Sequence, residues 1–326
     1  MSSPTVSVVM SVYNGADLLA ESIESVLDQE GVDLELVVVD DGSTDATAGI
    51  LDAYAARDRR VRVFHQENTG LTRALIRGCN EAQGHYIARQ DCGDVSLPDR
   101  LARQTQALDI DPRLSFVSCW TEFIGPEREF IRLEQGSRPA PTPCGIIDQE
   151  SPTLVRTGPS CHPSVMFRRS HYEQTGGYQA SFHFGQDWDL WYRLAQVGLF
   201  QMLEAPLYQA RLLPGSVSAR NRPLQQELAR LAREALRLRL AGKSDEPALE
   251  AAARIIPEPQ GTGDKDSRRA DWLYFIGEGL RRNGDRRALR YFREALSENH
   301  FHVKAWLRLI QTLTGTVPAP KNRQNT

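Results

Sequence analysis

The stretch Leu34-Glu-Leu-Val-Val-Val-Asp40-Asp41-Gly42-Ser43-Thr44-Asp45 decides the fold. A mostly apolar run leads directly into two carboxylates, a glycine and a hydroxyl-rich helix start, a pattern typical of a buried strand followed by a loop and a helix. Ligands of open α/β sheets bind at the carboxyl ends of the strands, so the two aspartates stand where a ligand would bind. The alternative is that they belong to a polar turn that only caps the helix.

A second strand, Val6–Val12, ends in the same manner, in Tyr13-Asn14-Gly15. An aromatic ring and polar groups at two strand ends favour a nucleotide pocket. Further strands are expected between helices over the first 120 residues, at Arg60–His65, His85–Arg89 and Leu114–Trp120. This alternation predicts an α/β fold with a nucleotide-binding, Rossmann-like, mostly parallel sheet and helices on both faces.

Two helices of this region have recognisable boundary residues. One is expected from about Leu71 to a C-terminal stop at Gly84. Another is expected to open at Pro98, because proline suits the first helical turn.

The composition excludes several classes of protein. The 326 residues carry a net charge of -3, which gives no electrostatic basis for binding nucleic acid. No run approaches the roughly 18 apolar residues of a membrane span. The five cysteines are scattered, which favours a reducing compartment over a disulfide framework. We therefore expect a cytoplasmic location.

The pattern changes along the second half of the chain. Residues 136–163 are rich in proline, glycine and serine and are expected to form a long functional connection. Order resumes at Ser164–Phe167 and in a helix from Asp187 to Val197. From Pro223 onward only helices are expected, with a linker at Pro257–Asp266. The predicted domains are 1–220, α/β, and 221–326, all-helical.

The C-terminal helices contain a loose internal sequence repeat. Asp271-Trp272-Leu273 recurs loosely as Ala305-Trp306-Leu307, at a spacing of 34 residues. That spacing is the period of tetratricopeptide repeats, which predicts such a structure from about residue 268 and a possible protein partner for it. The alternative is an ordinary helical hairpin.

Three carboxylate clusters follow strands or open helices. They are Asp40-Asp41, then Asp91-Cys92-Gly93-Asp94, then Gln186-Asp187-Trp188-Asp189. Two of them could hold a ribose and Mg²⁺ or Mn²⁺, which take oxygen ligands. A third could accept a proton from an incoming hydroxyl. Each cluster alone is equally compatible with a surface turn or with an acidic helix N-terminus.

The ordered motifs of this chain together resemble glycosyltransferase family 2, the inverting, nucleotide-sugar-dependent enzymes of the GT-A fold. The resemblance covers roughly Val6 to Leu213. Its motifs are Val8-Val-Met-Ser-Val-Tyr13-Asn14, Val38-Val-Asp40-Asp41-Gly-Ser-Thr-Asp45, Asn68-Thr-Gly70-Leu71, Gly84-His-Tyr-Ile-Ala-Arg-Gln-Asp91-Cys-Gly-Asp94, His162-Pro-Ser-Val-Met-Phe-Arg168 and Gly185-Gln-Asp187-Trp-Asp189-Leu-Trp-Tyr-Arg193.

The resemblance implies a role for individual residues. Asp187 would be the general base, Asp40 would bind the uracil or ribose, and Asp41 would support the turn. Asp91 and Asp94 lie in the region of the Asp-x-Asp motif and would bind the metal. On the acceptor side it implies His162, Gln186 and Trp188. The residues implied for the nucleotide sugar are Ser11, Val12, Tyr13, Asn14, Asp40, Gly70, Asp91 and Cys92.

Two positions depart from the family pattern. Gly93 stands where the family often has the metal-binding aspartate, which calls the expected Mn²⁺ or Mg²⁺ into question. Gln186 stands where a glutamate is common, and the loss of that neighbouring charge would favour the ionised form of Asp187. An aspartate with the unperturbed pKa of about 3.9 would be ionised at pH 7.

The implied activity is transfer of a sugar from a nucleoside-diphosphate sugar, UDP above all, to a hydroxyl of a glycan, lipid-linked or protein acceptor. Surface polysaccharide synthesis at the inner face of the membrane is the expected setting. One alternative is a degenerate nucleotide-sugar binder that acts as a partner-binding protein through its helical tail. Another is a nucleotidyltransferase, but Val12-Tyr13-Asn14-Gly15 lacks the basic residue of its phosphate loop.

Overall fold

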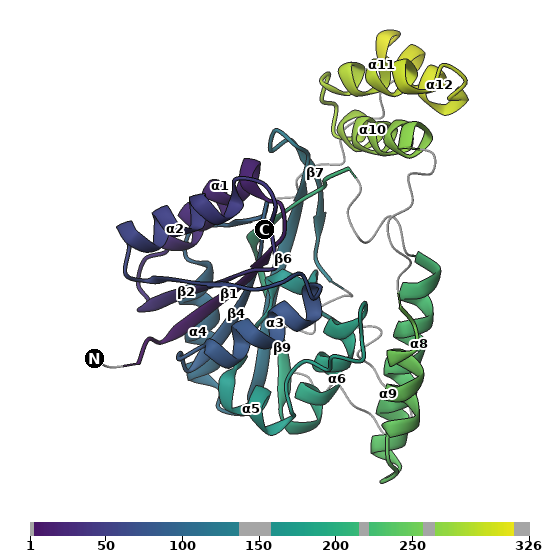
Figure 1. Ribbon diagram of the computed structural model, residues 1–326. Helices are drawn as coiled ribbons and strands as arrows, with labels where there is room; N and C mark the ends of the chain where they lie inside the picture. Colours follow the sequence, from purple (N-terminus) through teal and green to yellow (C-terminus); the bar gives the residue numbers. More distant parts are fainter. Residues whose placement is uncertain (1–2, 137–157, 215–221, 257–264, 316–326) are drawn as a thin grey trace. The chain divides into compact units, whose positions relative to one another are not determined.

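The computed structural model describes residues 3–136, 158–214, 222–256 and 265–315 (Figure 1). Most of the predicted 136–163 connection, and most of the predicted 257–266 linker, lie outside these residues. The chain forms two compact units. The first comprises Met1–Thr121, Glu134–Ala210 and Arg222–Pro257, and the second comprises Glu122–Leu133, Arg211–Asn221 and Glu258–Thr326.

A nine-stranded sheet organises the fold, in the order β3-β2-β1-β4-β8-β6-β9-β5, with β7 paired to β6. The pairs β1–β2, β1–β4 and β2–β3 are parallel, whereas β8 is antiparallel to both β4 and β6. The predicted mostly parallel α/β sheet is confirmed. The strands are β1 Val6–Val12, β2 Leu34–Asp40, β3 Val61–His65, β4 Tyr86–Asp91, β5 Val95–Ser96, β6 Leu114–Ile124, β7 Phe130–Glu134, β8 Met166–Arg168 and β9 Leu199–Arg211.

Helices cover both faces of the sheet because its central strands are apolar on both sides. Val9 and Val37 face one core, to which α3, α6 and α8 contribute, while Val8 and Val38 face the other, to which α1, α2 and α4 contribute. The helices are α1 Ala16–Leu27, α2 Thr47–Arg57, α3 Leu71–Glu81, α4 Arg100–Ile110, α5 Arg169–Gln174, α6 Gln186–Val197, α8 Arg222–Leu240, α9 Glu246–Ala253, α10 Lys265–Arg282, α11 Ala288–Glu298 and α12 Val303–Leu313.

Some predicted boundaries were wrong. Helix α3 ends at Glu81, not at Gly84. The glycine at 84 instead allows a close approach to β1, because a Cβ there would lie 2.5 Å from the backbone nitrogen of Ser7. Helix α4 begins at Arg100, two residues after Pro98. The short strands β5 and β7 and the long strand β9 had not been predicted.

The helices after residue 221 divide between the two units. Apolar residues of α8 and α9, such as Leu228, Leu236 and Ala252, pack into the core of the first unit. The first unit therefore includes Arg222–Pro257 and extends beyond the predicted boundary at residue 220. In the second unit, Ile131 packs with α10, α11 and α12 around Phe292. The C-terminal region is thus helical as expected, while its tetratricopeptide character and its protein partner stay predictions.

Within the part of the chain that the structure describes, no helix combines the length and the apolar character that crossing a bilayer requires.

The close contact at Gly84 gives a test of the fold. We expect Gly84→Ala to destabilise the protein by about 1–3 kcal/mol, the usual cost of overpacking a rigid neighbour. Gly49→Ala is the matched control, because nothing lies within 4 Å of a Cβ at this position in α2. Alanine there should stabilise the protein by about 0.4–1 kcal/mol. Urea denaturation of both variants measures the difference, and equal stabilities would contradict the contact.

Candidate active site

Parallel pairing brings the predicted polar residues to one edge of the sheet. Val12 of β1 is in register with Asp40 of β2, and Asp40 is in register with His65 of β3. On the other side of β1, Ser11 is in register with Asp91 of β4. Four of the predicted nucleotide-binding positions are therefore neighbours across the strand ends.

Asp40 is a buried carboxylate whose oxygens both have protein partners. Its Oδ1 accepts a hydrogen bond from the backbone of Ser43 at 3.0 Å, and its Oδ2 lies 2.9 Å from Nδ1 of His65. Burial opposes ionisation, but the hydrogen bonds from Ser43 and His65 outweigh it and lower the pKa of Asp40. The pKa of His65 is raised, first by Asp40 and then by Asp52. A nucleotide contact by Asp40 would thus use the remaining lone pairs of an ionised group.

Asp41 holds the loop that leads into α3. Its Oδ1 accepts from the backbone of Thr69 at 2.9 Å, and its Oδ2 accepts from the backbone of Gly70 at 2.8 Å. Gly70, with a φ of 89°, immediately precedes α3. These contacts are those of a turn support, the role that the family resemblance implies for Asp41.

The end of β1 leaves an aromatic ring in solvent. Asn14 joins the two strand-end loops, since its Oδ1 accepts from the backbone of Thr44 at 2.7 Å and its backbone donates to Oγ of Ser43 at 2.9 Å. The neighbouring Tyr13 is 52% exposed, whereas Val12 is buried. Tyr13 therefore offers a ring face on which a base could stack, and Val12 offers only backbone.

Cys92 packs against the start of α1. A Cβ added to Gly15, the residue before α1, would lie 2.6 Å from Sγ of Cys92. Burial raises the pKa of the Cys92 thiol to about 12, so the group is neutral and a poor nucleophile at pH 7. Its predicted contact with the nucleotide sugar stays a prediction.

The two candidate metal ligands have different surroundings. The Asp91 side chain is 40% exposed and its Oδ1 lies 2.5 Å from Nη2 of Arg89, which is fully buried. Asp94 is buried, and its Oδ2 accepts a hydrogen bond from the hydroxyl of Tyr208 at 2.9 Å. Between them Gly93, with a φ of 96°, brings no side-chain ligand.

These residues do not fit a divalent ion held by several protein groups. Across residues 3–136, 158–214, 222–256 and 265–315, no three histidine, cysteine or acidic side chains are grouped as metal ligands. Mg²⁺ is usually held by one or two carboxylates together with substrate phosphates. Of the two predicted ligands only Asp91 is exposed, so a Mn²⁺ or Mg²⁺ ion here would depend on Asp91 and on the substrate diphosphate.

Asp187 lies at the N-terminal turn of α6, directly after Gln186 and a glycine in left-handed conformation, Gly185. Burial raises the pKa of Asp187 to about 6; Asp91 raises it further, while Arg89 and a hydrogen bond from the Trp188 backbone lower it. The group is thus still mostly ionised at pH 7, as expected, but its pKa lies above the ordinary value of about 3.9. Desolvation, which the sequence did not show, tunes this group toward neutral pH.

Aromatic side chains and His162 surround the same region. Nε2 of His162 lies 2.7 Å from the hydroxyl of Tyr178, and burial lowers the pKa of His162 well below its ordinary value, so the ring is neutral. Electrostatic interactions link Tyr178 to both Asp187 and Asp91. The rings of Trp188 and Trp191 lie 5.1 Å apart.

Gln186 offers a polar atom on the same side. Its Oε1 is buried without a hydrogen-bond partner among the described residues. A buried acceptor left unpaired costs free energy, so it would gain from a hydroxyl donor. Of the residues predicted for the acceptor side, Trp188 thus contributes aromatic surface and Gln186 a buried, unpaired hydrogen-bond acceptor.

Three residues that shape the site were missed. Arg89 and Tyr178 interact with both Asp91 and Asp187, and Tyr208 holds Asp94. A signal existed for Arg89, because an arginine inside an otherwise apolar strand is rarely buried without a charged partner. None existed for Tyr208, which reaches Asp94 from β9, 114 residues later.

Comparisons with known proteins agree with this geometry. The model of the family described as Glycosyl transferase family 2 matches residues 7–176. The putative glycosyltransferase EpsE of Bacillus subtilis is 35% identical over 216 residues, which cover 64% of this chain and 74% of that protein. A chondroitin synthase of Escherichia coli is 29% identical over 224 residues, 69% of this chain, but only 31% of that longer protein is matched.

Solved structures show the same fold. S. aureus TarS 1-349, in a crystal structure in complex with UDP, superposes with a TM-score of 0.55 at 15% identity. The match covers 95% of this chain and 90% of that one. The chain therefore belongs to glycosyl transferase family 2 and is a glycosyltransferase of the GT-A fold.

Proposed function

We propose that the chain transfers a sugar from a UDP-sugar to an acceptor hydroxyl in one inverting displacement, with Asp187 as the general base. The observation that carries this proposal is the partly buried Asp187 carboxylate, whose desolvation raises its pKa to about 6. It interacts electrostatically with Asp91 of the strand-end cluster. A base with a pKa near the working pH is both mostly ionised and strong enough to take a hydroxyl proton.

The choice of donor and acceptor has two supports. The exposed ring of Tyr13 beside the buried Asp40 suits a nucleotide base, and structural neighbours are described in complex with UDP and UDP-GlcNAc. Relatives named as chondroitin and hyaluronan synthases act in glycan synthesis by their names. We therefore infer a glycan or glycan-carrying acceptor and a role in surface polysaccharide synthesis at the inner face of the membrane.

The chemistry follows from the placement of Asp187. Its carboxylate takes the proton of the acceptor hydroxyl while the hydroxyl oxygen attacks the anomeric carbon. The bond from that carbon to the diphosphate oxygen breaks on the opposite face, and nucleoside diphosphate leaves with the bonding electrons. His162 and Tyr178, hydrogen-bonded to each other, and the Trp188 ring would orient the acceptor.

Removing the base should abolish transfer but not donor binding. We expect Asp187→Asn to lower kcat by about 10²–10⁴-fold, the usual contribution of a general base. UDP binding, measured by calorimetry, should be unchanged. Asp17→Asn, at an exposed first-turn aspartate of α1, is the matched control and should keep full activity. Full transfer by a folded Asp187→Asn protein would refute the assignment.

The raised pKa of Asp187 predicts the pH dependence. Protonation removes the base, so kcat/KM should be constant above about pH 7 and fall as pH drops through about 6. Below that value it should fall about tenfold per pH unit. An initial-rate profile from pH 4.5 to 8 checks this. A profile that stays flat down to pH 5 would instead indicate an aspartate with an ordinary pKa.

Because Asp91 is the one exposed carboxylate of the two predicted ligands and Gly93 adds none, we expect weak metal dependence of donor binding. We expect the Kd for UDP to differ by less than about threefold between Mn²⁺ and EDTA. Gly93→Asp should introduce a Mn²⁺ dependence of about tenfold or more, because a second carboxylate then stands beside Asp91.

Gly93→Ala is its control, since alanine meets the same backbone strain at a φ of 96° without adding a ligand. Calorimetric titration of UDP into the three proteins measures these constants. Strong Mn²⁺ dependence in the unmodified protein would contradict this prediction and show that the existing carboxylates suffice to hold the ion on the diphosphate.

A further inference from the structure

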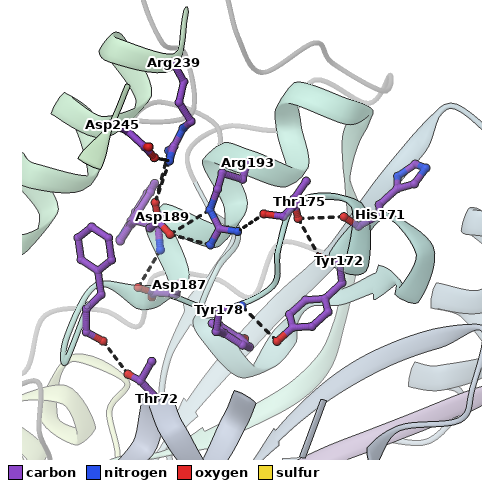
Figure 2. A network of polar contacts seen from close by, with 12 residues as sticks. Thr72, His171, Tyr172, Thr175, Tyr178, Asp187, Asp189, Arg193, Arg239 and Asp245 are labelled. Atoms are coloured by element: carbon purple, nitrogen blue, oxygen red, sulfur yellow. Dashed lines mark hydrogen bonds and ion pairs between the residues drawn. The ribbon is translucent and has the colours of Figure 1, made fainter. Parts of the chain in front are cut away.

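The helix that carries Asp187 also carries a fully buried charge. Asp189, two residues further along α6, is 0% exposed, and its Oδ2 accepts hydrogen bonds from Arg193 at 2.6 and 3.1 Å. Arg193 in turn donates to the carbonyl of Thr175 at 2.7 Å, in the segment after α5 (Figure 2). This chain of contacts ties α6 to the sheet side of the unit.

The other oxygen of Asp189 faces a residue from far along the chain. Its Oδ1 lies 3.3 and 3.5 Å from the two terminal nitrogens of Arg239, in the last turn of α8. Nη1 of Arg239 also donates to Oδ2 of Asp245, just before α9, at 2.7 Å. Figure 2 shows Arg239 between the two aspartates. Arg239 is thus shared by α6 and by the turn of the α8–α9 hairpin.

The same hairpin reaches the start of α6. A Cβ on Gly185, the residue before α6, would stand 3.7 Å from the backbone nitrogen of Ala229 in α8. Leu228 and Leu236 of α8 are fully buried in the core that also holds Leu190 of α6. Helix α8 therefore contacts α6 both at its N-terminal glycine and at Asp189.

The proposed role of Asp187 requires that its carboxylate be held in a precise position. A general base must lie within hydrogen-bond reach of the proton that it takes, and a misplacement of about 1 Å can cost about 10²-fold in rate. Asp187 and Asp189 share the first turn of α6. Whatever fixes Asp189 also fixes the base.

We propose that the α8–α9 hairpin is part of the catalytic apparatus, with Arg239 as a positioning residue that holds α6, and thereby Asp187, in place. The inference rests on the proposed role of Asp187. It adds a residue from beyond the segment 7–176 that the family model matches. Asp245 supports Arg239 by holding its guanidinium against Asp189.

The test compares two arginines of the same helix. Arg239→Met removes the guanidinium but keeps most of the side-chain length. Arg237→Met instead removes a 67% exposed arginine that pairs with the exposed Glu234 at 3.4 Å. We expect Arg239→Met to lower kcat by about 10–100-fold with the Kd for UDP changed less than twofold. Arg237→Met should match the unmodified protein in both quantities. Arg239→Lys should recover part of the loss.

A milder variant covers the case in which Arg239→Met does not fold. Asp245→Asn leaves the Arg239–Asp189 pair intact and removes only its outer support, so we expect a smaller loss of kcat, of about 3–10-fold. Circular dichroism at the assay temperature confirms that each variant is folded. Full kcat in both folded variants, or a parallel loss of UDP binding, would overturn the positioning role.

A double-mutant cycle separates this proposal from the function on which it rests. If Arg239 acts through Asp187, Arg239→Met should lower the residual rate of Asp187→Asn by less than twofold. Multiplicative losses would overturn the inference while leaving Asp187 as the base. An active Asp187→Asn protein would refute the base assignment itself, whatever Arg239 does.

Discussion

The parallel pairing of β1 with β2 on one side and β4 on the other is the constraint on which the site depends. It places the ends of three strands side by side, with Asp40 and Asp91 flanking β1. Because side chains alternate along a strand, a shift of one residue in either register would turn one of these carboxylates into the core. Apolar side chains on both faces of β1 and β2 prevent such a shift.

Burial then gives each carboxylate of the site a different character. Asp40 is held ionised by hydrogen bonds that outweigh its desolvation, whereas desolvation dominates at Asp187 and raises its pKa. Asp91 remains partly exposed, paired with the buried Arg89. In the proposed mechanism, residues of one chemical type are thus divided between donor binding and proton transfer by their surroundings.

The sequence was most informative where function depends on neighbouring residues in the chain. The strand Val6–Val12 was predicted with its observed bounds, and the predicted strand Leu34–Val39 is one residue shorter than β2. Both predictions succeeded because a long apolar run followed by polar turn residues has few other interpretations. The direction in which Asp94 points could not be predicted, since Tyr208 reaches it from β9. The raised pKa of Asp187 could not be predicted for the same reason: its desolvation comes from residues that only the fold brings together.

The base and the donor-binding residues stand on parts of the fold with different sources of rigidity. Asp40 and Asp91 lie at the ends of strands bonded on both sides by the sheet. Asp187 lies on a helix, which has no ladder of hydrogen bonds to its neighbours and must be fixed by packing and by side-chain contacts. The buried Asp189 supplies such contacts, but an unpaired charge there would be costly, so its two oxygens require partners from outside the first turn. Arg193 supplies one partner from α6 itself, and Arg239 supplies the other from α8. If Asp187 is the base, a helical element that packs on the sheet domain late in the chain thereby becomes necessary to the chemistry at its active site.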